Sequence, residues 1–168
     1  IARALSEHPP ENTRVLFLST SEEALCEGMG LFMERHASEL PVDRTFFLCL
    51  DTLGSPRLLV LRGEGMLKLR EYPAESLDLL DSTAHQLDID LFPNLRLRNA
   101  TDGIFPLAAG YQCVSVASCN RWKNPSNYHW RTDLPENVDY DTVADAIRLS
   151  EAVIGKLDDN WLTGCSSA

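Results

Sequence analysis

The segment TFFLCLDTLG, residues 45–54, is a short apolar run that stops at a carboxylate, Asp51. A near-continuous apolar run of this length is typical of a strand that is buried on both faces of a sheet. A second such run, RVLFLS at 14–19, precedes the acidic pair Glu22 and Glu23. The sequence therefore predicts two buried strands, each followed by acidic residues.

Helical patterns alternate with apolar runs along the rest of the chain. Further strands are expected at 57–61, 95–97 and 113–117, and helices at about 21–38, 75–88, 104–109 and 141–157. This alternation predicts an α/β sandwich. Because only a Gly-Ser-Pro turn separates the runs at 45–50 and 57–61, we expect these two strands to pair as neighbours.

Length and composition limit the classes of function. A chain of 168 residues with 44% hydrophobic content is sufficient for one domain with a real core. The net charge of −10 and the scattered Lys and Arg residues argue against a nucleic-acid partner. No apolar stretch approaches the roughly 20 residues that span a bilayer. The five cysteines have no C-x-x-C spacing, which argues against a zinc-cysteine site or a disulfide scaffold.

The pair Glu22 and Glu23 allows two interpretations. Thr20 and Glu23 fit a capping box, in which they bind the free amide groups of a helix start. Adjacent carboxylates at the exit of a strand can also divide two tasks, with one holding a metal and the other handling protons. Both interpretations remain open, because a glutamate in the first turn can begin a helix while its carboxylate faces a metal.

Other polar residues share this position in the predicted sheet. Asp51 follows the strand at 45–50, Asp102 follows 95–97, and His129 lies in the loop after 113–117. Side chains just beyond the carboxyl ends of strands converge on one crevice in such a sheet. Carboxylates and an imidazole without thiolates suit a catalytic zinc ion.

Four segments carry a resemblance to a known family. They are STSEEAL at 19–25, FFLCLDTLG at 46–54, ATDGIFPLAAG at 100–110 and NYHWRTDLPENVDY at 127–140. In this order they resemble the M28 family of zinc exopeptidases. The resemblance implies a mixed, largely parallel sheet flanked by helices on both faces, in a three-layer sandwich. It also implies an aminopeptidase-like metalloprotease that hydrolyses peptide or aminoacyl substrates, with two zinc ions in the complete domain.

The resemblance assigns roles to individual residues. Glu22 matches the family's general base, which acts on a metal-activated water, and Glu23 matches a ligand of one zinc. Asp51 matches a ligand of the other zinc, and His129 matches the second protein ligand of the zinc held by Glu23.

Two further residues are candidates for the surroundings of the metals. Asp102 matches the acidic residue of the family's Ser-Asp-His type motif, although Gly103 follows it here in place of His. Tyr128 is beside His129 and could donate a hydrogen bond to a developing oxyanion, or it could simply pack under the loop.

The family pattern also requires an upstream histidine and a bridging aspartate, which this sequence lacks. We therefore expect residues 1–168 to form a single domain that is the C-terminal portion of a peptidase-like catalytic domain, inactive alone, with 159–168 as a flexible tail. Two alternatives stay open. One is a catalytically inactive peptidase-like interaction domain, and the other is a transferase that resembles glutaminyl cyclase and uses a single zinc.

Overall fold

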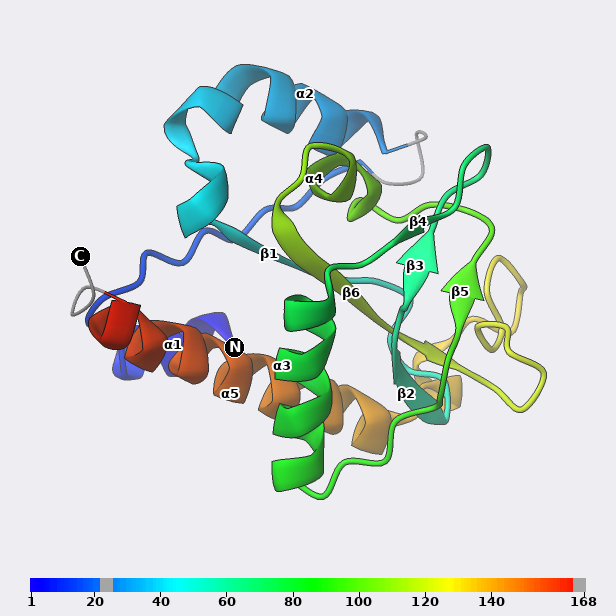
Figure 1. Ribbon diagram of the computed structural model, residues 1–168. Helices are drawn as coiled ribbons and strands as arrows, with labels where there is room; N and C mark the ends of the chain where they lie inside the picture. The colour runs from blue at the N-terminus through cyan, green and yellow to red at the C-terminus, as the bar shows by residue number, and fades with distance from the viewer. Residues whose placement is uncertain (22–25, 165–168) are drawn as a thin grey trace.

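The computed structural model describes residues 1–21 and 26–164, which form two three-stranded sheets with surrounding helices (Figure 1). The helices and strands are α1 (Ala2–Glu7), α2 (Glu27–His36), β1 (Phe46–Leu50), β2 (Arg57–Val60), β3 (Gly63–Glu64), β4 (Arg70–Glu71), α3 (Ala74–Gln86), β5 (Arg96–Leu97), α4 (Ile104–Ala108), β6 (Gln112–Cys119) and α5 (Tyr140–Gly164). Short 3-10 helices lie at Ala37–Glu39, Val42–Arg44 and Pro135–Asn137.

The larger sheet has the order β1-β6-β2. β1 runs parallel to β6, with Cys49 opposite Ser115, and β2 runs antiparallel to β6. The prediction that the strands at 45–50 and 57–61 are neighbours is wrong, because β6 lies between them. The eight-residue β6 is almost wholly buried, so the backbone groups on both of its edges need a partner strand.

The smaller sheet has the order β4-β3-β5 and was not predicted apart from β5. β3 pairs antiparallel with β4 and parallel with β5. Each of the two described sheets thus combines a parallel and an antiparallel pair. The mixed α/β class is confirmed.

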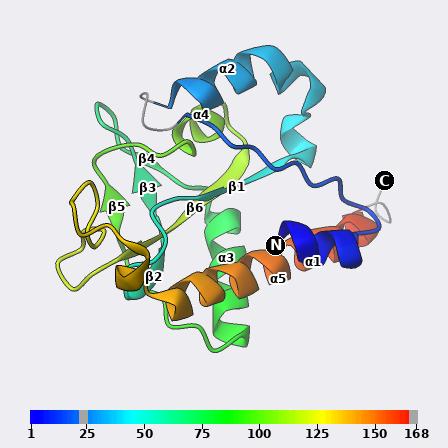
Figure 2. The ribbon, with the colours of Figure 1, turned by 180° about the vertical axis from the view of Figure 1, so that it is seen from behind.

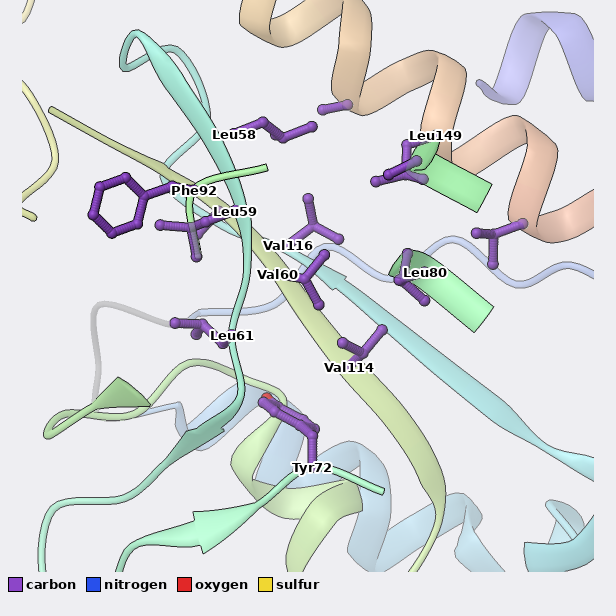
Figure 3. Close-up of a cluster of buried hydrophobic side chains, with 14 of the residues drawn as sticks. Leu58, Leu59, Val60, Leu61, Tyr72, Leu80, Phe92, Val114, Val116 and Leu149 are labelled. Atoms are coloured by element: carbon purple, nitrogen blue, oxygen red, sulfur yellow. The ribbon is translucent and has the colours of Figure 1, made fainter. Parts of the chain in front are cut away.

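Helices cover both faces of the larger sheet (Figures 1 and 2). α3 and α5 pack on each other and against β2, while α4 packs on β6 and carries α2 above it. In the main core, Val60 and Val116 lie toward Leu80 and Leu149, while Leu59 lies beside Phe92 (Figure 3). The helices and this core hold β1 and β6 in place, and the loops that follow those strands carry the predicted site.

The segment at 14–19 is not a strand, which corrects the prediction. Its side chains are open to solvent, with Leu16, Phe17 and Leu18 at 50%, 58% and 42% exposure. A strand needs a neighbour for its N–H and C=O groups, and no described segment pairs with this one. The apolar run thus has the composition of a strand without a partner.

The helix boundaries also differ from the expected ones. α2 begins at Glu27 rather than near Ser21, and Cys26, its N-cap, has a left-handed backbone (φ 59°). The suggested capping box includes Glu23, which lies outside the described residues. α5 continues past Leu157 to Gly164, so residues 159–164 are helical rather than part of a tail.

Candidate functional site

The candidate site lies at the carboxyl ends of β1 and β6. These two strands are parallel, so the segments that follow them emerge at the same edge of the sheet. Asp51 comes directly after β1, where its N–H donates to the Val116 carbonyl at 3.0 Å. The loop after β6 carries Tyr128 and His129. This arrangement brings the predicted positions 51 and 129 to one edge, as the sequence suggested.

The two segments are hydrogen-bonded to each other. The Ser126 N–H donates to Ser55 Oγ at 2.8 Å, and the Asp139 N–H donates to the Gly54 carbonyl at 2.8 Å. Between the segments lies a cavity of about 80 Å³. Thr52 and Tyr128, the neighbours in sequence of Asp51 and His129, both line it. The turn after Asp51 therefore fixes the loop of His129.

His129 is exposed and its ring stacks on that of Tyr128, with the ring centroids 3.8 Å apart and the planes at 19°. Its backbone lies in the left-handed region, with φ 59°. For a residue other than glycine this conformation costs on the order of 1 kcal/mol, so it persists only where the surroundings enforce it. Here the surroundings are the stacked Tyr128 ring and the hydrogen bonds that hold the loop to the turn after Asp51.

Asp102 lies just before α4 and is 8% exposed. The Thr20 hydroxyl donates to its Oδ2, while its Oδ1 is buried and has no hydrogen-bond partner among residues 1–21 and 26–164. A buried carboxylate oxygen without a donor is costly and calls for an explanation. Through Thr20, Asp102 also contacts the segment that leads to Glu22 and Glu23. These two glutamates lie outside the described residues.

A buried cluster of polar side chains supports the main chain around Asp102. We call it the Glu64 cluster, and it consists of Glu64, Tyr72, Thr101 and Ser115. Tyr72 Oη donates to Glu64 Oε1 at 2.7 Å, and the Thr101 N–H donates to Oε2 at 2.8 Å. Ser115 Oγ lies 2.6 Å from Tyr72 Oη and 2.9 Å from Thr101 Oγ1. The cluster thus joins β3, β6 and the loop before α4.

Burial determines the acidity of these groups. It raises the pKa of the Glu64 carboxyl, while the hydrogen bonds from Tyr72 and Thr101 act in the opposite direction. Burial also raises the pKa of the Cys49 thiol to about 11. Cys49 Sγ donates to Thr101 Oγ1 at 3.7 Å. Since alternate residues of a strand share a face, Cys49 and Asp51 are on the side of β1 that faces the Glu64 cluster.

Glu64, Tyr72 and Ser115 were not predicted from the sequence. Two-residue strands such as β3 and β4 have no recognisable period, and glutamate is ordinarily exposed. The one available signal was Thr101, which lies within the segment ATDGIFPLAAG next to Asp102.

Zinc would need more donors than the described residues bring together. Across residues 1–21 and 26–164, no three His, Cys, Asp or Glu side chains form a group that could hold a metal ion. Asp51 and His129 offer an oxygen and a nitrogen, and this donor chemistry fits zinc. The third predicted ligand, Glu23, belongs to the part that the structure does not describe.

The chain is similar to a known protein family and to a solved structure. The profile of Peptidase family M28 matches residues 1–154. The crystal structure of a glutaminyl cyclase from an Acidobacteriales bacterium is similar, with a TM-score of 0.67 and 15% sequence identity over 95% of this chain. At that identity the likeness shows a shared fold. This chain spans 58% of the length of the cyclase chain.

A search of curated proteins finds no match. None of the helices in the described parts of the chain has both the length and the apolar character needed to cross a bilayer.

Proposed function

This chain belongs to peptidase family M28, and from that membership we propose that it carries the general base and metal ligands of an aminopeptidase-like zinc exopeptidase. One observation carries the proposal. The loop of His129 is hydrogen-bonded to the turn that follows Asp51, around a common cavity. This contact supports the proposal, because the loops that carry Asp51 and His129 meet at one edge of the sheet.

In this proposal Glu23 and His129 hold one zinc ion and Asp51 belongs to the other. Bound zinc supplies Lewis acidity and lowers the pKa of a coordinated water. The carboxylates and the imidazole match the ligands that catalytic zinc prefers. A two-zinc site would also need the upstream histidine and the bridging aspartate of the family pattern.

The other side chains handle protons and position the substrate. Glu22 takes a proton from the attacking water and passes it to the leaving amine. Asp102 offers its unpartnered Oδ1 to the free amino group of the substrate, an interaction that satisfies the buried oxygen. Tyr128 lies at the edge of the cavity and can donate to an oxyanion. Peptides with a free amino terminus are therefore the proposed substrates.

The test compares Glu22→Gln with Glu27→Gln in the full-length protein. Glu27 is exposed in the first turn of α2, so this control makes the same change of charge at a residue with no proposed role. We expect E22Q to lower kcat for an aminoacyl anilide by about 100-fold or more, because a general base contributes that much, and E27Q to leave it unchanged. Zinc content, measured by mass spectrometry, should stay at the wild-type level in E22Q and fall in His129→Ala.

Equal activity of E22Q and wild type would refute the role of Glu22. A full-length protein that purifies without zinc and does not bind it would refute the enzyme altogether and favour an interaction domain.

A second candidate is a glutaminyl-cyclase-like transferase with a single zinc. The similarity of fold to the solved cyclase over 95% of this chain favours it. The same preparations distinguish the two candidates. One equivalent of zinc with cyclisation of a glutaminyl peptide supports the transferase, and two equivalents with release of the anilide support the exopeptidase.

A further inference from the structure

We propose that Glu64 is a positioning residue for the proposed exopeptidase site, because it anchors the main chain on both sides of Asp102 and so directs the Asp102 carboxylate. This inference rests on the proposed function. The argument begins with the burial of Glu64, which is fully excluded from solvent. Its contacts among the described residues are hydroxyl and amide donors rather than a cation. Such burial is expensive, so the hydrogen bonds must be well formed.

The two carboxylate oxygens of Glu64 join different segments. Oε1 accepts from Tyr72, which follows β4, and Oε2 accepts from the Thr101 N–H. The Gly103 N–H in turn donates to Thr101 Oγ1 at 3.1 Å. The residues before and after Asp102 are therefore both tied to the Glu64 cluster, while Asp102 Oδ1 has no partner in the part of the chain that the structure describes. This is the arrangement expected of a carboxylate held ready for a ligand.

The Glu64 cluster fills the space next to Gly103 in which a side chain at that position would lie. A Cβ atom at this position would lie 2.5 Å from both Ser115 Oγ and Tyr72 Oη, and 3.1 Å from Glu64 Oε1. The motif that this segment resembles has histidine at position 103. In this protein, the Glu64 cluster occupies the volume that a side chain at position 103 would need.

Glu64→Gln is a sharp probe of this role. Every hydrogen bond that reaches Glu64 is donated to it, by Tyr72 or by Thr101. Glutamine keeps the size of the side chain but turns one acceptor into an NH₂ donor. With the NH₂ in the place of Oε2, it faces the Thr101 N–H, which cannot accept. With the NH₂ in the place of Oε1, the hydroxyls of Tyr72 and Thr101 must accept instead of donate. Either orientation weakens an anchor of the Asp102 loop.

The experiment measures hydrolysis of an aminoacyl anilide by the full-length protein, at a temperature where each variant is folded. We expect E64Q to lower kcat about tenfold and to change KM less than twofold, because hydrogen bonds to a buried carboxylate are worth about that much. Glu71→Gln is the matched control. Glu71 is exposed on the neighbouring β4, where it pairs with Arg96, and E71Q should leave kcat unchanged.

A double-mutant cycle shows whether Glu64 acts through Asp102. In an Asp102→Asn background, E64Q should lower kcat by less than about twofold further, since the group it directs is already altered. Independent, additive losses would overturn the proposal. Tyr72→Phe removes one anchor with a milder change, so it replaces E64Q in the cycle if that variant does not fold.

Hydrogen exchange gives a readout that does not need activity. In E64Q the amides of Thr101 and Gly103 should exchange faster, while those in the middle of β6 keep their protection. Unchanged protection at both positions would overturn the proposal. Faster exchange at both, in a protein that shows no hydrolysis even as wild type, would support the anchoring by Glu64 and refute the proposed function instead.

Discussion

At the scale of the residue, the burial of Glu64 makes the free energy of unfolding depend on pH. The pKa of its carboxyl is raised in the folded protein above the ordinary value of 4.5, mainly by burial. Below that ordinary value the carboxyl is protonated in both the folded and the unfolded chain. As the pH rises, the unfolded chain loses the proton first. The contribution of Glu64 to stability is therefore lost as the pH rises through the folded pKa.

We predict that the free energy of unfolding of the wild type falls relative to that of E64Q between pH 4 and the folded pKa of Glu64. Position 64 does not titrate in E64Q, so the difference between the two proteins isolates this group. Urea unfolding followed by circular dichroism at a series of pH values provides the measurement. A difference that grows in favour of the wild type with rising pH would mean that the folded pKa is lowered instead.

At the scale of the element, the segment at 14–19 shows that an apolar run need not be buried. Leu59 in β2 is 1% exposed, whereas Phe17 is 58% exposed. We predict that Phe17→Ala changes the free energy of unfolding of this chain by less than about 0.5 kcal/mol, as is usual for exposed positions. Leu59→Ala should cost about 2–5 kcal/mol, because it empties part of the core.

Chemical denaturation of the two variants provides the comparison. A loss for Phe17→Ala as large as the loss for Leu59→Ala would show that the segment is packed as a buried strand after all.

Strands longer than three residues could be predicted from sequence alone, and their partners could not. The apolar runs at 45–50, 57–61 and 113–117 correspond to β1, β2 and β6. Their order in the sheet depends on which neighbour best satisfies the long, buried β6, and a single run carries no information on that. The strand predicted at 14–19 was wrong for the same reason. Apolar side chains favour a strand, but they do not show whether another strand lies beside it.

At the scale of the whole molecule, the meeting of the loops that follow β1 and β6 could be predicted better than the buried cluster that supports Asp102. Asp51 and His129 were predicted from a general rule, that segments following parallel strands share one edge. The Glu64 cluster could not be predicted, because its members come from β3, β6 and two loops whose approach depends on the packing of both sheets. Only the folded chain brings Ser115 next to Tyr72.

We predict that residues 1–168 on their own bind zinc weakly. A catalytic zinc site usually has three protein ligands, and the described residues contain no group of three suitable side chains. Dialysis against micromolar zinc, followed by metal analysis, should find much less than one equivalent retained. Retention of a full equivalent that is lost in His129→Ala would contradict this prediction.

Gly103 also constrains which substitutions can accumulate around Asp102. A histidine at this position would need the volume now held by the Tyr72 hydroxyl, Ser115 Oγ and a carboxylate oxygen of Glu64. Substitution of Gly103 by histidine alone would place its Cβ 2.5 Å from both Ser115 Oγ and Tyr72 Oη, so these side chains would have to move. We therefore expect relatives to inherit positions 64, 72, 103 and 115 as a linked set, so that a glycine after the aspartate accompanies the buried glutamate and a histidine accompanies its absence.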